Sequence, residues 1–439
     1  MTRTIRTSAL EYVDKPVLPL LENDDVEIIV DDYTKLEIES KDEKLKDFLK
    51  TKDIDLYEIP NKDGKIDKLK IKVGQYVGSA EFSNFVIQVS PKFSNIESLG
   101  QLIDYAYEFK DDDFPDNTIK FKEGQNQPFE YIVQSFVYST QKLVKRGFYR
   151  SYVVIEEDIP YLKGKLLLKQ QILNDLKFNL RFSCEHDEFT ANNLENQIVL
   201  YTLKFCYRHT RIENRKIQIQ RLIHQMDYDV NVPTYLSVDE FNKISYTRLN
   251  QYYEKVHQLC KLLLVHSGVL NLKEQKTEFI FPFFVEMWDV FQCFISILFK
   301  EFYQLYSESD PKTSTYAWKI DGIRHTIKPD IITYLDKKSK VVHSILDVKY
   351  MKEIETGSKE QYQIAFYLND YKKRIAYAIL PEDQKKSKPI DHIALNQDLE
   401  IRVRHIPIDD VLTRIYGKKR KEDEEWIKDL LLSKFPLVI

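Results

Sequence analysis

Apolar and polar residues alternate along the N-terminal part of the chain in the way that β-strands require. Leu69, Ile71 and Val73 are separated by lysines, and a second apolar run, 85–89, ends just before Pro91. Successive side chains of a strand point to opposite faces, so this alternation predicts strands with one buried face. We therefore predict a small β-rich domain at about 26–93, followed by a helix at about 99–109.

The middle of the chain carries apolar residues at the three- and four-residue spacing of helices. The spacing is present in 127–150, and it returns from about Asn192 to Ser267. Between these two stretches, residues 153–155 and 160–162 have the pattern of extended chain. An apolar stripe at helical spacing is usually buried, so we interpret these residues as the core of a mainly helical region.

The last part of the chain mixes both patterns. The order is helix, hairpin, helix and strand, which is typical of an α/β core with a mixed sheet. The predicted elements are a helix at 284–306, strands at 327–335 and 341–350 around a polar turn, a helix from Gly357 to Tyr371, and strands at 374–380 and 399–406. The predicted fold class is multidomain α+β, with an N-terminal β-rich domain (1–120), a mainly helical middle domain (121–280) and an α/β domain (281–439).

Length and composition agree with several folded domains. A chain of 439 residues is too long for one ordinary hydrophobic core, and 43% hydrophobic with 31% charged residues is globular composition. The formal charge of −4 argues against a protein that coats nucleic acid nonspecifically, although it permits a local basic groove.

The cysteines and the hydropathy of the chain indicate the cellular compartment in which the protein works. The four cysteines include no CxxC pair, which argues against a disulfide framework or a zinc site. The first residues lack the apolar segment of a signal peptide, and no stretch approaches the roughly 20 apolar residues that cross a bilayer. We expect a soluble, cytoplasmic protein without a membrane partner.

The candidate chemistry lies on the predicted hairpin of the last domain. Asp347 and Lys349 end an apolar strand, and alternation places both on one face of it. Asp330 lies on the preceding strand, so the hairpin can bring the two carboxylates together at one sheet edge. The same D-x-K motif occurs at 63–65, where we expect a turn, so the short motif alone does not indicate a catalytic site. A surface salt bridge between Lys349 and one aspartate is the alternative interpretation.

Two carboxylates offer the hard oxygen ligands that Mg²⁺ prefers. Asp330 and Asp347 would hold the ion, which activates water and stabilises charge on a phosphate, while Lys349 would orient that water and neutralise the transition state. Gln363 on the next helix could hold the water or a phosphate, with plain helix surface as the alternative. Tyr367 shares its helix face, and we expect it to pack in the core.

These residues resemble the PD-(D/E)xK nuclease superfamily and, more narrowly, the McrC family of McrBC-type restriction systems. The resemblance rests on Asp330 in a Pro-Asp pair, Asp347-Val348-Lys349, and Gln363 to Tyr367. It extends over most of the chain through further segments, which are 73–78, 86–92, 162–166, 184–190 and Asn196.

The resemblance implies a magnesium-dependent DNA endonuclease subunit that serves restriction and phage defence. Its DNA would be brought by a separate AAA+ GTPase partner of McrB type, on which the N-terminal and middle domains would dock and which they would stimulate. The chain has no G-x-x-x-x-G-K-[ST] phosphate loop, so we do not expect it to hydrolyse nucleotide itself. The stretch 69–90 could be a hairpin that reaches into the ring, or a sheet in an ordinary core.

One departure from the family pattern concerns the helix before the hairpin. Family members commonly carry a Phe-Glu pair there, whereas this chain reads Phe291-Gln292. Asp289 or Glu286 could act as an outer acid instead; otherwise each is a solvated or capping charge. The departure leaves open whether the site takes one or two metal ions.

Two rival functions remain at this point. The first is a noncatalytic adaptor that activates the motor while its nuclease fold is inert, and the second is a free-standing repair or recombination nuclease. Basic clusters at 385–388 and 418–421 could contact phosphates, but a solvated loop is an equal alternative for each.

Overall fold

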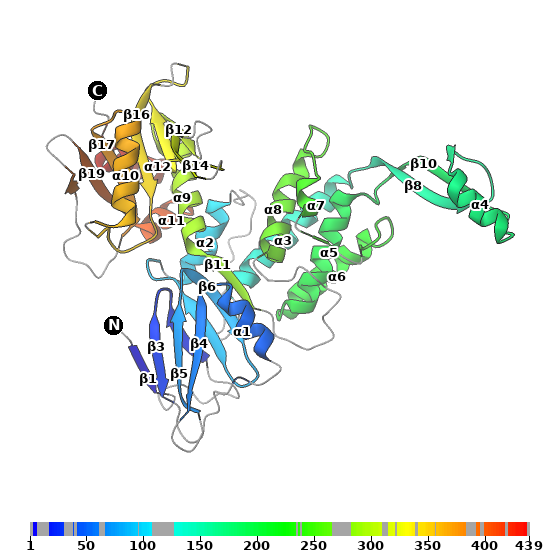
Figure 1. Cartoon of the computed structure of the whole chain (residues 1–439), viewed down its shortest axis with the longest axis horizontal. Helices are drawn as coiled ribbons and strands as arrows, with labels where there is room; N and C mark the ends of the chain where they lie inside the picture. Colours follow the sequence, from blue (N-terminus) through cyan, green and yellow to red (C-terminus); the bar gives the residue numbers. More distant parts are fainter. Residues whose placement is uncertain are drawn as a thin grey trace. The chain divides into compact units, whose positions relative to one another are not determined.

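The computed structural model describes most of the chain, and it folds as two compact units (Figure 1). One unit contains Met1–Thr118 and Phe284–Ile439, and the other contains Ile119–Phe283. The described residues are 3–6, 17–29, 38, 42–60, 66–94, 96–107, 127–233, 236–237, 239–265, 282–309, 315–320, 323–338, 341–355, 357–382, 392–395, 399–417 and 420–436. The basic cluster 385–388 and Lys418 and Lys419 lie outside these residues.

The N-terminal part of the first unit consists of two four-stranded sheets. Their strand orders are β1-β3-β5-β4 and β11-β6-β7-β2. The strands are β1 (Arg3–Arg6), β2 (Val17–Leu21), β3 (Asp25–Ile29), β4 (Ile54–Pro60), β5 (Ile66–Val73), β6 (Tyr76–Glu81), β7 (Val86–Ser90) and β11 (Phe283–Glu286). The predicted alternation is confirmed, because Leu69, Ile71 and Val73 are buried.

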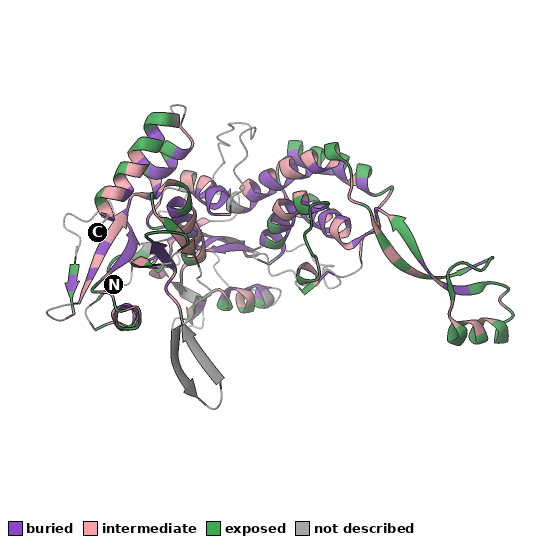
Figure 2. Ribbon diagram, turned by 90° about the horizontal axis from the view of Figure 1, so that it is seen from above, coloured by how far each residue is buried: buried purple, intermediate pink, exposed green. Residues whose placement is uncertain are grey.

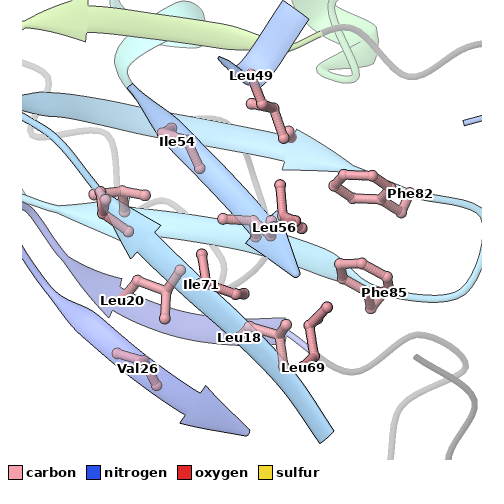
Figure 3. Close-up of a cluster of buried hydrophobic side chains, with 14 of the residues drawn as sticks. Leu18, Leu20, Val26, Leu49, Ile54, Leu56, Leu69, Ile71, Phe82 and Phe85 are labelled. Carbon is pink, nitrogen blue, oxygen red and sulfur yellow. The ribbon is translucent and has the colours of Figure 1, made fainter. Parts of the chain in front are cut away.

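Side chains from both sheets form one hydrophobic core, together with Leu49 of helix α1 (Glu43–Lys50) (Figure 3). Phe82 and Phe85 stack within it, with ring centroids 4.5 Å apart. The stretch 69–90 is therefore a pair of sheets in an ordinary core, and the alternative of a hairpin that reaches into a ring is wrong for this stretch. Phe284, from much later in the sequence, is part of the same core.

The predicted helix at 284–306 begins later than expected. Its first residues form β11, which joins the N-terminal sheet beside β6, and helix α9 then runs from Met287 to Phe302. The backbone N–H of Met287 donates to Gln75, at 2.9 Å between N and O. The apolar pattern of 283–286 suits a buried strand as well as a helix, and pairing with β6 decides between them.

The C-terminal part of the first unit is a six-stranded mixed sheet in the order β12-β15-β16-β17-β19-β18. Its strands are β12 (Tyr306–Ser309), β15 (Ile331–Tyr334), β16 (Val342–Val348), β17 (Ile375–Pro381), β18 (His392–Ala394) and β19 (Glu400–Ile406). Strands β16, β17 and β19 are parallel, and β15 pairs antiparallel with β16. A further two-stranded sheet consists of β13 (Thr315–Ile320) and β14 (Ile323–Ile327).

Helices pack against the mixed sheet. Helix α10 (Lys359–Asp370) connects β16 to β17 and shares a core with the sheet through Ile364, Tyr367 and Leu368. Phe435, the residue after helix α12 (Arg420–Lys434), packs on Tyr377 and on Phe299 of α9. Helix α2 (Ile96–Ala106) packs on α9, and Tyr416 at the end of α11 (Ile408–Ile415) donates to Asp104 at 2.7 Å.

The second unit is mainly helical, in agreement with the prediction for this region. Its helices are α3 (Gln127–Arg146), α5 (Leu194–His209), α6 (Glu213–Met226), the short α7 (Asp239–Asn242) and α8 (Glu254–Val265). A buried ion pair links two of them, because Arg215 of α6 donates to Glu130 of α3. The Glu130 carboxylate also accepts from the Thr210 hydroxyl and the Arg211 N–H.

A three-stranded sheet and one helix project from these helices, and we call residues 151–190 the arm (Figure 1). The arm contains β8 (Ser151–Ile159), β9 (Lys165–Leu166), α4 (Leu168–Leu176) and β10 (Phe182–Thr190). Helix α4 has no buried residue. Most of the arm is exposed, as Figure 2 shows. No helix in the described part of the chain has the length and hydropathy needed to cross a membrane.

Candidate active site

The antiparallel pairing of β15 and β16 places Asp330 next to the end of β16. Ile331 is opposite Leu346, so Asp330, one residue earlier, is level with Asp347. The backbone N–H of Val348 donates to Asp330 at 2.7 Å between N and Oδ2. The hairpin therefore brings the two aspartates to one sheet edge, which is the geometry that the sequence pattern predicted.

Asp347 is a buried carboxylate, with 1% of its surface exposed. The Nζ of Lys349 lies 2.9 Å from its Oδ2, and no hydrogen-bond donor among the described residues reaches its Oδ1. Burial raises the pKa of Asp347 to about 7, and Lys349 opposes this rise while Asp330 adds to it. A buried carboxylate with an unpaired oxygen is costly unless a cation compensates it.

Asp330 is held from two sides. Its Oδ2 accepts from Val348, and its Oδ1 accepts from the side-chain amide of Gln292 at 2.9 Å. Both of these donors are neutral, so they orient the carboxylate without contributing a charge of their own. Asp330 therefore presents a fixed negative group beside Asp347.

Lys349 and Gln363 meet across the gap between β16 and α10. The ammonium of Lys349 donates to Gln363 at 3.2 Å between Nζ and Oε1. Ser358 caps the start of α10 by accepting from the N–H of Gln361, which fixes where the helix begins. Asp330, Asp347, Lys349 and Gln363 are thus gathered at one place by a hairpin and the helix that follows it.

Tyr367 is a core residue, as predicted, but its hydroxyl also belongs to this network. The side chain is fully buried, and its hydroxyl accepts from Gln363 at 2.8 Å and donates to the carbonyl of Lys328 at 2.6 Å. Burial raises the pKa of Tyr367, and the nearby Asp347 adds to this rise. The hydroxyl is therefore a neutral donor and acceptor.

The two suggested outer acids do not join the aspartates. The carboxylate of Asp289 accepts from the Tyr107 hydroxyl at 2.6 Å, and Glu286 lies beside Lys52 and Tyr76. Within the described part of the chain, no three His, Cys, Asp or Glu side chains are grouped so that they could hold a metal ion. The face of α9 toward the site carries Gln292, which contacts Asp330, so a role for Asp289 or Glu286 as an outer acid stays a prediction.

Sequence reasoning missed two neighbours of the site. Gln292 was noted only as a departure from the family pattern, and no sequence signal revealed its contact with Asp330. Glu360 lies near enough for its carboxylate to raise the pKa of Asp347. Its spacing gave a signal, because Glu360 is three residues before Gln363 and shares its helix face.

The residues present fit a divalent cation that keeps much of its water. Asp330, directly before β15, and Asp347, on β16, offer two carboxylates, and Oδ1 of Asp347 is buried without a donor among the described residues. Mg²⁺ is characteristically held by one or two carboxylates, with water and substrate oxygens completing its coordination. The two-carboxylate set suits this kind of ion, whereas a cage supplied entirely by protein would need more acidic groups.

The chain matches the sequence model of one protein family. The model for "McrBC 5-methylcytosine restriction system component" matches residues 71–381. No curated protein sequence matches the chain significantly.

Two solved structures from Thermococcus gammatolerans are similar to the chain. The first is a "Refined half-complex from tetradecameric assembly of Thermococcus gammatolerans McrB AAA+ hexamers with bound McrC", with a TM-score of 0.58 at 22% identity, covering 95% of this chain and 99% of that one. The second is a "Cryo-EM structure of the Thermococcus gammatolerans McrBC complex", with a TM-score of 0.44 at 24% identity, covering 65% of this chain and 87% of that one.

The first likeness shows a shared fold over nearly the whole chain, and the family model spans most of the sequence. The expected relation to the McrC family is therefore confirmed: the chain belongs to the McrBC 5-methylcytosine restriction system component family.

Proposed function

We propose that this chain is the magnesium-dependent DNA endonuclease subunit of a McrBC-type restriction system, with a PD-(D/E)xK nuclease core built on β15, β16 and α10. The observation that carries the proposal is the meeting of Asp330, Asp347 and Lys349 at one sheet edge, with Asp347 buried beside an ammonium group. A structural salt bridge does not require a second carboxylate at the same place, since that carboxylate raises the cost of burying the pair.

Each residue has a role that its position supports. Asp330 and Asp347 would hold Mg²⁺, which supplies an activated water and charge stabilisation at the scissile phosphate. Lys349, between Asp347 and Gln363, would orient the attacking water and neutralise charge that develops on the phosphate. Gln363 would keep the ammonium group directed into the site.

DNA and a separate AAA+ GTPase of McrB type are the proposed partners. The similar assembly is described as McrB AAA+ hexamers with bound McrC, and this chain has no phosphate loop of its own. The proposed complex acts in the cytoplasm in restriction and phage defence. GTP hydrolysis by the partner would bring DNA to the nuclease.

The arm is the proposed docking element for the motor. Polar side chains fix α4 to the strands, because Asn174 donates to Asp158 at 2.7 Å and Gln171 accepts from the Ser183 N–H at 2.9 Å. The apolar side chains of α4 are exposed instead, namely Leu168, Ile172, Leu173 and Leu176. A helix that turns its apolar side chains to solvent is typical of a protein-binding surface.

A plasmid cleavage assay with the motor, GTP and Mg²⁺ tests the nuclease proposal. Asp347→Ala and Lys349→Ala should each abolish cleavage. Asp336→Ala and Lys337→Ala are matched controls, because they change the same residue types at the other, exposed end of the same hairpin. Full cleavage by both site variants would overturn the assignment.

The second candidate function is a noncatalytic adaptor that only stimulates the motor. Gln292 favours it, since an amide stands where family members commonly carry an acid. Stimulated GTP hydrolysis without cleavage by the wild-type complex, with any of Mg²⁺, Mn²⁺ or Co²⁺, would establish the adaptor function.

A further inference from the structure

We propose that Tyr367 is a positioning residue for the nuclease reaction: its hydroxyl sets the orientation of the Gln363 amide, which in turn holds the Lys349 ammonium group beside Asp347. This inference rests on the proposed nuclease function and deepens it. Tyr367 itself contacts neither Asp330 nor Asp347 through any hydrogen bond of the network described above.

The network has a fixed direction of donation. Lys349 donates to Oε1 of Gln363 at 3.2 Å, Nε2 of Gln363 donates to the Tyr367 hydroxyl at 2.8 Å, and that hydroxyl donates to the Lys328 carbonyl at 2.6 Å. A hydroxyl has one proton, so donating it to a carbonyl leaves only lone pairs for Gln363. The NH₂ group of Gln363 must then face Tyr367, and its oxygen must face Lys349.

Removal of the hydroxyl would remove one of the two contacts that set the amide orientation and leave only the contact with Lys349. A Gln side chain can rotate its amide by half a turn at little steric cost, because the oxygen and the NH₂ group have nearly the same size. The rotated amide would present donors to the Lys349 ammonium group, which has no acceptor. Lys349 would then lose the neutral partner that holds it in place.

The same hydrogen-bond network contacts residues near both proposed metal-binding aspartates. Lys328, whose carbonyl accepts from Tyr367, is two residues before Asp330, and Lys349 is two residues after Asp347. Val348 donates to Asp330 between them. Because the Tyr367 ring is buried in the core beneath α10, the hydroxyl connects a rigid anchor to both strands.

The simpler alternative is that the hydroxyl only satisfies buried polar groups. That role predicts a loss of stability upon removal of the hydroxyl, without a specific effect on Lys349. The two possibilities differ in their dependence on Gln363, which makes a double-mutant cycle the appropriate test.

The test compares Tyr367→Phe, Gln363→Ala and the double variant in the assembled complex, with Mg²⁺ and GTP. Tyr367→Phe should lower kcat about tenfold, which corresponds to one hydrogen bond of about 1.4 kcal/mol, and should leave KM for DNA within about twofold. In the Gln363→Ala background, the same change should have little further effect. Tyr362→Phe is the matched control, since Tyr362 is exposed on the same helix.

A second readout does not need cleavage. The rate at which acetic anhydride modifies Lys349, followed by mass spectrometry, should rise about threefold or more in Tyr367→Phe relative to Lys337, because the Lys349 side chain, 13% exposed in the wild type, is no longer held against Gln363 and becomes more accessible to the reagent. Unchanged kcat and labelling, or strictly additive losses in the cycle, would overturn the inference. A wild-type complex that never cleaves would overturn the nuclease proposal instead, and the labelling rate would still decide the role of Tyr367.

Discussion

The side-chain amide of Gln292 donates a hydrogen bond to Asp330, with 2.9 Å between Nε2 and Oδ1, and so connects helix α9 to the strand that begins the candidate site. A neutral amide orients Asp330 without adding a third negative charge. In this respect the site differs from the family pattern, in which an acid commonly stands at this position.

Gln292→Glu should therefore change how the site binds metal. A third carboxylate would repel Asp330 and lower Tm in metal-free buffer, while its charge would raise Mg²⁺ affinity by about tenfold. Tm measured against Mg²⁺ concentration reports both effects. Gln292→Leu is the control, since it removes the hydrogen bond without adding charge. An unchanged Mg²⁺ affinity in Gln292→Glu would contradict the prediction.

Asp347→Asn should stabilise the metal-free protein at neutral pH. The pKa of Asp347 is about 7 in the folded chain, above its ordinary value of 3.8. The folded state therefore keeps a proton that the unfolded state loses, and stability falls as the pH rises between these two values. The difference in Tm between variant and wild type should grow across this interval and then stay constant at higher pH. Each kcal/mol of difference in unfolding free energy corresponds to a Tm difference of about 2–4 °C.

Thermal melts from pH 4 to pH 8, about the interval between the two pKa values, would check this dependence. Asp336→Asn on the same hairpin is exposed and should melt like the wild type at every pH. A gap that stays constant with pH would show that Asp347 does not carry the predicted protonation change.

Mg²⁺ should stabilise the wild-type chain in the absence of DNA and motor. Binding to the folded state alone raises stability with the logarithm of the free ion concentration. Asp330→Asn and Asp347→Asn should abolish this dependence, and EDTA should reverse it in the wild type. If both variants respond to Mg²⁺ as the wild type does, the ion binds elsewhere.

Polar substitutions on the arm should separate docking from folding. Leu168→Ser and Leu176→Ser change side chains that are 68% and 72% exposed, so each should alter stability by no more than about 0.5 kcal/mol. The double variant should bind the motor at least about tenfold more weakly, because exposed apolar area drives such contacts. Lys169→Ser on the same helix is the control, and motor binding equal to the wild type would refute the docking role.

Arg215→Ala should destabilise the second unit strongly. It would leave the Glu130 carboxylate buried without its cationic partner, which costs about 3–5 kcal/mol. Hydrogen exchange in α3 and α6 localises the effect. Arg221→Ala changes an exposed residue of the same helix and should have a small effect. Equal exchange in both variants would mean that the ion pair contributes little.

Several features of the fold could be predicted from sequence because they depend on local geometry. The alternation at Leu69, Ile71 and Val73 fixes which face of β5 is buried, whatever the strand pairs with. The order of strands and helices after residue 327 likewise gave the mixed sheet. Asp330 and Asp347 come close because a short connection joins β15 to β16 as a hairpin, although a register shift between Thr333 and Tyr334 also decides which residues lie opposite each other.

Other features depend on contacts between distant segments, and no local pattern specifies those. Residues 283–286 have a pattern that suits strand or helix, and only pairing with β6 made them a strand. The sequence analysis predicted no helix at 168–176, and the arm exposes the apolar residues of α4.

The sequence by itself determined the buried faces of elements such as β5 and the place of the two aspartates and the lysine on one hairpin, because strand and helix periodicity are properties of the local chain. Only the tertiary structure decided that Gln292, rather than Asp289 or Glu286, meets Asp330, and that the Tyr367 hydroxyl reaches Gln363. These contacts depend on how helices pack on the sheet, and small rotations of a helix change which side chain faces the site.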